Sequence, residues 1–434
     1  MNRYIFKHRK IATSFRDKAL YEYFILTRDL LKRILERLRE TKFLNDHEQT
    51  LVNNLLKLSV NCLSFDFIGT IMDESNDDSA CVQIPTTWRP VFLEDNILKL
   101  YFDLFHLLPS HLASLSLSCL VQLASIRRTI FQNAERLLFI ENLFIGIRNI
   151  LENPQGLSDQ TCFHEFCRLL SRLKVNFQLS ELIKVPDYQV TLDLIAKFTV
   201  QSFQMLNNAG NSVYYLLFLW QKMISSMAYV KGPEPHCLDR YAPDVTAAYI
   251  RSRIDICSEV LYNDVEDPFD DIAVIEQQLE LLSSISRCDY EKTCSLIVSI
   301  FDVDAPKYQE LVNSLNVNKQ LAIIEEMRLT WLLYIISAAI SAKMYSTTLE
   351  KEEQMDGELA VRVLQLMNFT DSRLTDNRGF SQRIELGYLN FFEKFKKSYM
   401  HEQMAINSVV FKHLGEVLRI NDESQLLSVF VRKL

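Results

Sequence analysis

LVNNLLKLSVNCLSF, residues 51–65, is the stretch that decides the fold class. Apolar side chains recur in it at steps of four, three, four and three residues, at Leu51, Leu55, Leu58, Cys62 and Phe65. Because an α-helix makes one turn in about 3.6 residues, this spacing puts the five side chains on one helix face. The stretch is therefore predicted to be an amphipathic helix.

The same periodicity continues on both sides of this stretch, whereas β-strand signals are nearly absent. It predicts roughly seventeen helices in all. Besides 51–65, their approximate ranges are 20–38, 96–107, 112–126, 128–151, 159–174, 188–206, 212–228, 245–262, 272–286, 290–301, 308–315, 319–343, 357–369, 380–400, 405–418 and 423–433. The sequence thus predicts an all-α protein.

Gly and Pro are scarce, with nine glycines and ten prolines among 434 residues. Tight turns and hairpins depend on these two residue types, so long helices joined by short connections are favoured. The prolines are expected to lie between helices or at helix starts, Pro306 among them, because proline disrupts a helix interior. Two longer gaps remain: an exposed acidic loop at about 66–93 and a proline-rich loop at about 229–243.

Antiparallel helix pairs are the arrangement that this pattern favours. A pair takes about 35–50 residues, near the period of roughly 40–47 residues of HEAT and armadillo repeats. We therefore expect one HEAT-like helical-repeat solenoid segment over residues 1–434, in which each pair buries its apolar stripe against its neighbours. A large irregular helical bundle is the alternative that the period leaves open.

Composition restricts the function classes. The net charge of −8 and the pI near 5.6 argue against broad nucleic-acid binding. The most apolar stretch, 329–342, is shorter than the roughly 20 residues that a bilayer requires, so it is predicted to be a buried core helix. Nine scattered cysteines indicate reduced thiols. Phosphate-binding loops, dinucleotide fingerprints and hydrolase motifs are lacking, so no cofactor and no catalysis are expected.

Candidate protein-binding residues lie in the acidic loop and at one helix junction. The loop contributes Asp73, Glu74, Asp77, Asp78 and Trp88. Its carboxylates suit a basic partner surface, and solvation alone is the plainer interpretation. Trp88 either pins the loop to the helices, which we favour, or anchors a partner.

The junction in SIRRTIFQNAER, residues 125–136, contributes Arg127, Arg128 and Arg136. Arginines at such a turn pair with carboxylates of the neighbouring repeat or contact a partner at the exposed repeat edge. Cys162, His164 and Cys167 lie close together in sequence, but a zinc site needs a fourth ligand. Helix packing is therefore the favoured interpretation of these three residues.

Ten short segments carry a family resemblance. They are SFDFIGT (64–70), QIPTTWR (83–89), SIRRTIFQNAER (125–136), ILENPQGLSD (150–159), FHEFCRLLSRLK (163–174), VKGPEPH (230–236), RCDYEKTC (287–294), RLTWLLYII (328–336), DGELAVRVLQLMNFTDSRL (356–374) and INDESQLLSVFVRKL (420–434). In this collinear order they resemble the exportin-7 family, with its paralogue Ran-binding protein 17, in the importin-β (karyopherin) superfamily.

The resemblance implies a nuclear transport receptor that binds the GTPase Ran in its GTP form, protein cargo and nucleoporins. Such a protein shuttles between cytoplasm and nucleus through the nuclear pore, with no direct nucleic-acid contact and no membrane insertion. The resemblance also implies that the chain is a central portion lacking the N-terminal Ran-binding domain and the C-terminal half. The alternative function is a helical-repeat scaffold or adaptor for complex assembly or trafficking unrelated to Ran.

Overall fold

The computed structural model describes residues 10–11, 13–65, 82, 84–93, 97–205, 210–230, 235–263, 265–314, 318–342, 349–374, 381–400 and 408–433. In these ranges the regular structure consists of helices and one isolated parallel bridge between Val82 and Ile126. The predicted all-α class is therefore confirmed. None of the described helices is long and apolar enough to cross a membrane.

Two compact units divide the chain. Unit 1 comprises residues 1–198 and 208–237, and unit 2 comprises residues 199–207 and 238–434. The expectation of one continuous solenoid over residues 1–434 stays a prediction, since each unit is described by itself.

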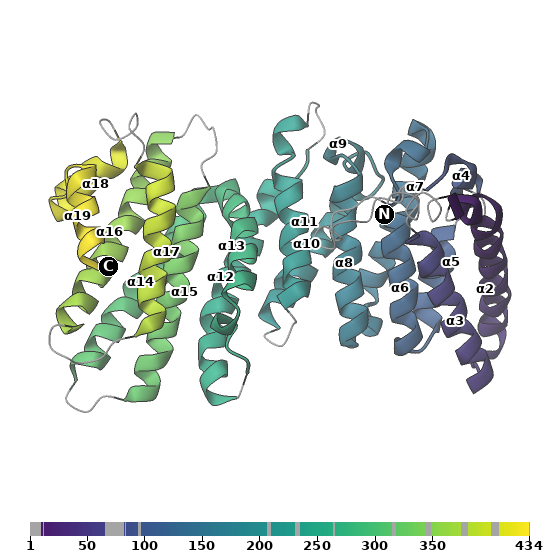
Figure 1. Cartoon of the computed structure of the whole chain (residues 1–434), viewed down its shortest axis with the longest axis horizontal. Helices are drawn as coiled ribbons and strands as arrows, with labels where there is room; N and C mark the ends of the chain where they lie inside the picture. The colour runs from purple at the N-terminus through teal and green to yellow at the C-terminus, as the bar shows by residue number, and fades with distance from the viewer. Residues whose placement is uncertain are drawn as a thin grey trace. The chain divides into compact units, whose positions relative to one another are not determined.

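Unit 1 packs each helix against near neighbours in the chain (Figure 1). Its helices are α2 (Tyr21–Thr41), α3 (Asp46–Leu63), α4 (Arg89–Leu93), α5 (Ile97–Leu107), α6 (Ser110–Ala124), α7 (Asn133–Glu152), α8 (Gln160–Asn176), α9 (Leu179–Leu182), α10 (Tyr188–Gln204, whose end belongs to unit 2) and α11 (Gly210–Ile224). Shorter turns are η1 (Arg16–Leu20), η3 (Thr86–Trp88), η5 (Arg128–Ile130), η6 (Pro154–Ser158) and η7 (Met227–Tyr229). Helix α6 contacts α3, α5 and α8, and α8 contacts α11.

Unit 2 is built around α15, which is buried on all sides over residues 329–340. Its helices are α12 (Leu238–Tyr262), α13 (Ile272–Ser286), α14 (Tyr290–Asn313), α15 (Lys319–Ser341), α16 (Leu349–Leu374), α17 (Gln382–Tyr399), α18 (Val409–Leu418) and α19 (Glu423–Lys433), with turns η8 (Pro268–Asp270) and η9 (Arg287–Asp289). Helix α15 packs against α12, α13, α14 and α17, so the predicted core helix at 329–342 is confirmed. This repeat-like packing confirms the HEAT-like class.

Three details of the predicted helices are wrong. The proline-rich loop was expected to extend to Pro243, but α12 begins at Leu238 and contains this proline. In α3 the buried face consists of Val52, Leu55, Leu56, Ser59, Cys62 and Leu63. Leu51 and Leu58 are 46% and 38% exposed, so the buried stripe is rotated from the predicted one. Pro306 lies inside α14, which continues where two helices were expected. The buried side chains Phe301, Ala305 and Tyr308 keep one face across the proline, and their packing offsets the lost backbone hydrogen bond.

Candidate protein-binding surface of unit 1

The acidic candidates Asp73, Glu74, Asp77 and Asp78 lie outside the described residues, so their attraction for a basic partner stays a prediction. The described end of their loop is held to the junction between α6 and η5. Val82 donates its amide N–H to the Ser125 carbonyl at 2.9 Å, and Arg127 donates its amide N–H to the Val82 carbonyl at 3.0 Å. Val82 therefore lies against the junction that contains Arg127.

Trp88 pins the segment that follows the acidic stretch. Its side chain is 1% exposed, its ring stacks on Phe24 at 5.3 Å between centroids, and it meets Tyr21 edge-on at 5.4 Å. An aromatic side chain this deeply buried has no surface left for a partner, so Trp88 belongs to the core. The structure therefore agrees with the interpretation that Trp88 holds its segment to the helices, and it disagrees with the interpretation that Trp88 anchors a partner.

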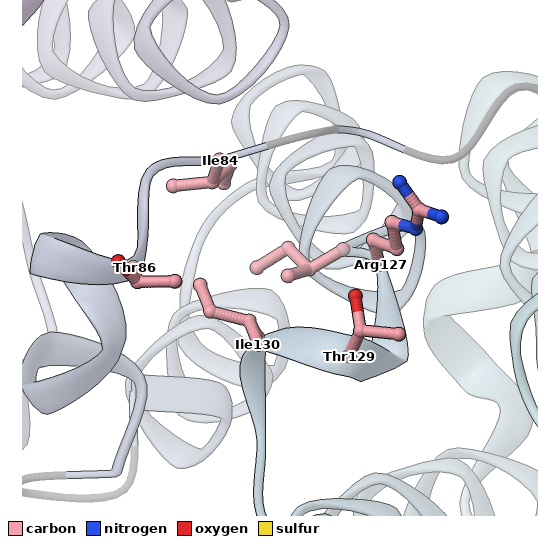
Figure 2. A pocket seen from close by; sticks show the side chains of 6 residues that line it. Ile84, Thr86, Arg127, Thr129 and Ile130 are labelled. Carbon is pink, nitrogen blue, oxygen red and sulfur yellow. The ribbon is translucent and has the colours of Figure 1, made fainter.

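A small pocket lies where the two segments meet (Figure 2). It has a volume of about 150 Å³. Figure 2 shows one wall formed by Ile84 and Thr86 and the facing wall by Thr129 and Ile130, while the Arg127 guanidinium points away from both. The isoleucines are buried and the threonines are exposed, so the pocket has an apolar floor and a polar rim. Its size suits one side chain rather than a cofactor, since ligand pockets usually exceed about 300 Å³.

Arg128 and Arg136 share one carboxylate from the next repeat. In α9, Glu181 Oε2 lies 3.2 Å from Arg128 Nη1. The other carboxylate oxygen, Glu181 Oε1, lies 2.7 Å from Arg136 Nε. Asn176 at the end of α8 accepts the Arg128 amide N–H at 3.2 Å, which fixes the junction against α8. Both arginine side chains thus pair with a neighbouring carboxylate, which is one of the two interpretations that the sequence allowed. Arg127 is exposed, and no described carboxylate lies within ion-pair distance of it.

Two lysines that the sequence analysis did not single out extend the positive charge. Lys174 occupies the last turn of α8 and Lys222 the last turn of α11. Burial lowers the pKa of Lys174, and the positive charges of Arg128 and Lys222 lower it further, whereas Glu181 acts in the opposite direction. We call Arg127, Arg128, Arg136, Lys174 and Lys222 the unit 1 basic surface. The packing of α11 against α8 brings Lys222 near Lys174, and Asn176 at the end of α8 binds the Arg128 amide.

Cys162, His164 and Cys167 are directed to different neighbours. The Cys162 thiol lies 3.5 Å from the Ser110 carbonyl oxygen, and His164 Nδ1 lies 3.1 Å from the Ser212 hydroxyl. Cys167 is buried in the α8 core. Cys162 and His164 therefore link α8 to α6 and α11, and among the described residues no group of potential ligands is assembled for a metal ion.

Thiol reactivity should follow this burial. Eight cysteines are described as free thiols, and six of them are buried, with only Cys237 and Cys288 partly accessible. Burial raises the pKa of Cys62 to about 11 and that of Cys257 to about 12, which suppresses the reactive thiolate at pH 8. We expect Cys237 to react fastest with a thiol reagent in native protein, and every thiol to react after denaturation.

The measurement is a timed native titration on a Cys81→Ser background, because Cys81 lies outside the described residues. Cys237→Ser should remove the fast phase. Fast labelling of six or more thiols in native protein would contradict the described packing.

Comparison with known proteins gives similarity along nearly the whole chain. The chain is 49% identical over 429 residues to exportin-7-B of Xenopus laevis, 48% over 428 residues to Ran-binding protein 16 of Drosophila melanogaster, and 46% over 428 residues to Ran-binding protein 17 of Homo sapiens. The chain is therefore similar to proteins of the exportin-7 family. Residues 256–434 also match the family model described as "Exportin-7-like, TPR domain". Each alignment covers 99% of the chain and 39% of the relative, so the chain spans about two fifths of the length of these relatives.

Proposed function

We propose that the chain acts in a nuclear transport receptor of the exportin type, which binds Ran in its GTP form and carries protein cargo out of the nucleus. The observation that carries the proposal is the identity of 46–49% along 99% of the chain to proteins named exportin-7, Ran-binding protein 16 and Ran-binding protein 17. Similarity this continuous retains the helices and the junctions between them, which are the parts that a helical-repeat protein presents to partners.

The geometry of the described residues supports a binding role. Helix pairs bury their apolar faces against one another and leave helix ends and junctions to contact partners, as in other repeat proteins. The pocket beside η5 is the size of one side chain, and the charged groups around it are ion pairs and surface cations. The proposal therefore includes no catalytic step and no cofactor.

Nucleoporins and a distribution between cytoplasm and nucleus complete the proposal, because an export receptor must cross the pore in both directions. Arg127, Arg128 and Arg136 are proposed contact residues in unit 1. The acidic residues Asp73, Glu74, Asp77 and Asp78 are proposed to attract a basic partner surface, and that attraction should weaken as salt is raised.

Shuttling in living cells tests this function against the adaptor alternative. After photobleaching of the nuclear pool, fluorescently tagged protein should re-enter the nucleus from the cytoplasm. A tagged cytoplasmic helical-repeat protein of similar mass is the control and should not recover. Confinement of the tagged protein to one compartment would favour a scaffold or adaptor unrelated to Ran.

A further inference from the structure

The unit 1 basic surface carries more positive charge than its own ion pairs neutralise. Arg128 and Arg136 converge on Glu181, and Lys174 and Lys222 extend the cluster along the ends of α8 and α11. Glu135, the sequence neighbour of Arg136, is bound by Arg89 instead. Among the described residues, Glu181 raises the pKa of Lys174, whereas Arg128 and Lys222 lower it.

Helix dipoles explain only part of this charge. A cation in the last turn of a helix is stabilised by the helix dipole, and this applies to Lys174 and Lys222. It does not apply to Arg127 and Arg128, which belong to the junction before α7. Lys174 lies close enough to the charges of Arg128 and Lys222 for its pKa, already lowered by burial, to fall further. Like charges held together in this way favour binding of an anionic partner.

The pocket adjoins the same charges. Arg127 contributes to its wall, and Arg128 follows directly in η5. The floor is formed by Ile84, Ile126 and Ile130, and the exposed Thr86 and Thr129 leave the mouth open between the two segments (Figure 2). An aliphatic side chain entering it would be surrounded by apolar carbon and flanked by positive charge.

We propose that the unit 1 basic surface and this pocket form a docking site for an acidic segment of a partner protein. One aliphatic side chain of the segment enters the pocket, and flanking carboxylates contact Arg127, Lys174 and Lys222. The inference stands apart from the proposed export function, since it requires neither Ran nor cargo.

A protein segment fits the site better than a nucleic acid does. Phosphates would satisfy the cations, but a nucleic acid has no aliphatic group for a pocket of about 150 Å³ with an isoleucine floor. The net charge of −8 also opposes the approach of a long polyanion, whereas a short acidic segment senses mainly the local cations.

The test uses a fluorescein-labelled peptide with one leucine between two pairs of glutamates, titrated with the 434-residue chain and followed by anisotropy. The double variant Lys174→Glu/Lys222→Glu should bind at least about tenfold more weakly. The double variant Lys396→Glu/Lys397→Glu is the matched control, because these lysines also occupy a last helix turn and carry the same charge change. The control should bind like the unaltered chain.

Replacing the peptide leucine by serine tests the pocket and should weaken binding by about tenfold. Raising the salt concentration should weaken binding of the leucine peptide to the unaltered chain, which gives a readout that does not depend on any variant folding. Circular dichroism checks that both double variants keep their helix content. Equal affinity of the unaltered chain and Lys174→Glu/Lys222→Glu, no peptide binding at low salt, or tighter binding of a single-stranded oligonucleotide of equal charge would each overturn the proposal.

Discussion

Replacing Asp356 by alanine is expected to destabilise unit 2 by about 3–5 kcal/mol, because it removes one of the two carboxylates that pair with the buried Arg287 and leaves two buried tyrosine hydroxyls without an acceptor. Asp356 in α16 is 1% exposed, and its carboxylate lies 3.2 Å from Nη2 of Arg287. It also accepts hydrogen bonds from the hydroxyls of Tyr290 and Tyr399. One side chain thereby ties α16 to η9, α14 and α17.

Arg287 has few other ways to satisfy its charge. Its side chain is 2% exposed, and Nη1 lies 2.9 Å from Glu352, while Nη2 donates to the Ala339 carbonyl at 2.8 Å. Without Asp356 the guanidinium keeps these two contacts, but both tyrosine hydroxyls lose their acceptor in the core. Burial prevents water from replacing it, so the full desolvation penalty is felt.

Native-state hydrogen exchange measured by mass spectrometry would give the free energy of opening for peptides from α14 to α17. Asp302→Ala is the matched control, since Asp302 forms an ion pair with Arg362 at 2.7 Å but is 51% exposed. An exposed pair of this kind contributes at most about 1 kcal/mol. Similar effects of the two substitutions would show that the Asp356 cluster is not the buried link described.

Replacing Trp88 by alanine should destabilise unit 1 by about 3–5 kcal/mol, the usual cost of removing a large buried aromatic side chain. Phe24, which stacks on Trp88, is fully buried and would line the cavity left behind. Hydrogen exchange should accelerate in α2, α4 and α5. Tyr229→Ala is the control, because Tyr229 is 80% exposed and its loss should change stability by less than about 0.5 kcal/mol. If Trp88→Ala left exchange unchanged, Trp88 would have to be treated as a surface residue.

The helices were predictable from the sequence because the apolar side chains that recur at helical spacing form the face that packs into the core. The core helix α15 was predictable in turn from its apolar run at 329–342. The rotated stripe of α3 did not follow, because Leu51, Val52 and Leu58 are all apolar and only the neighbouring helices decide which of them is covered. The continuous helix through Pro306 depended in the same way on packing, which local rules do not contain.

The kind of contact at the candidate site could be predicted from the sequence, but the residues that form it could not. Arginines at a repeat junction were expected to find a neighbouring carboxylate, and Arg128 and Arg136 do so. That the carboxylate is Glu181, and that Lys174 and Lys222 lie nearby, depends on contacts between residues about 50 positions apart. Apolar periodicity places each lysine at the end of its own helix but does not show which helix ends meet.

Binding of Ran tests the central proposal most directly. Ran loaded with a non-hydrolysable GTP analogue and Ran loaded with GDP would be titrated separately against an immobilised protein in which the chain is joined to the N-terminal domain that the family resemblance assigns to Ran binding, with a related small GTPase in its GTP form as the specificity control. The account predicts that the GTP form of Ran binds at least about tenfold more tightly than the GDP form, a difference of about 1.4 kcal/mol, and that the control GTPase does not bind. Equal affinity for the two nucleotide states of Ran, or no binding of either, would contradict it.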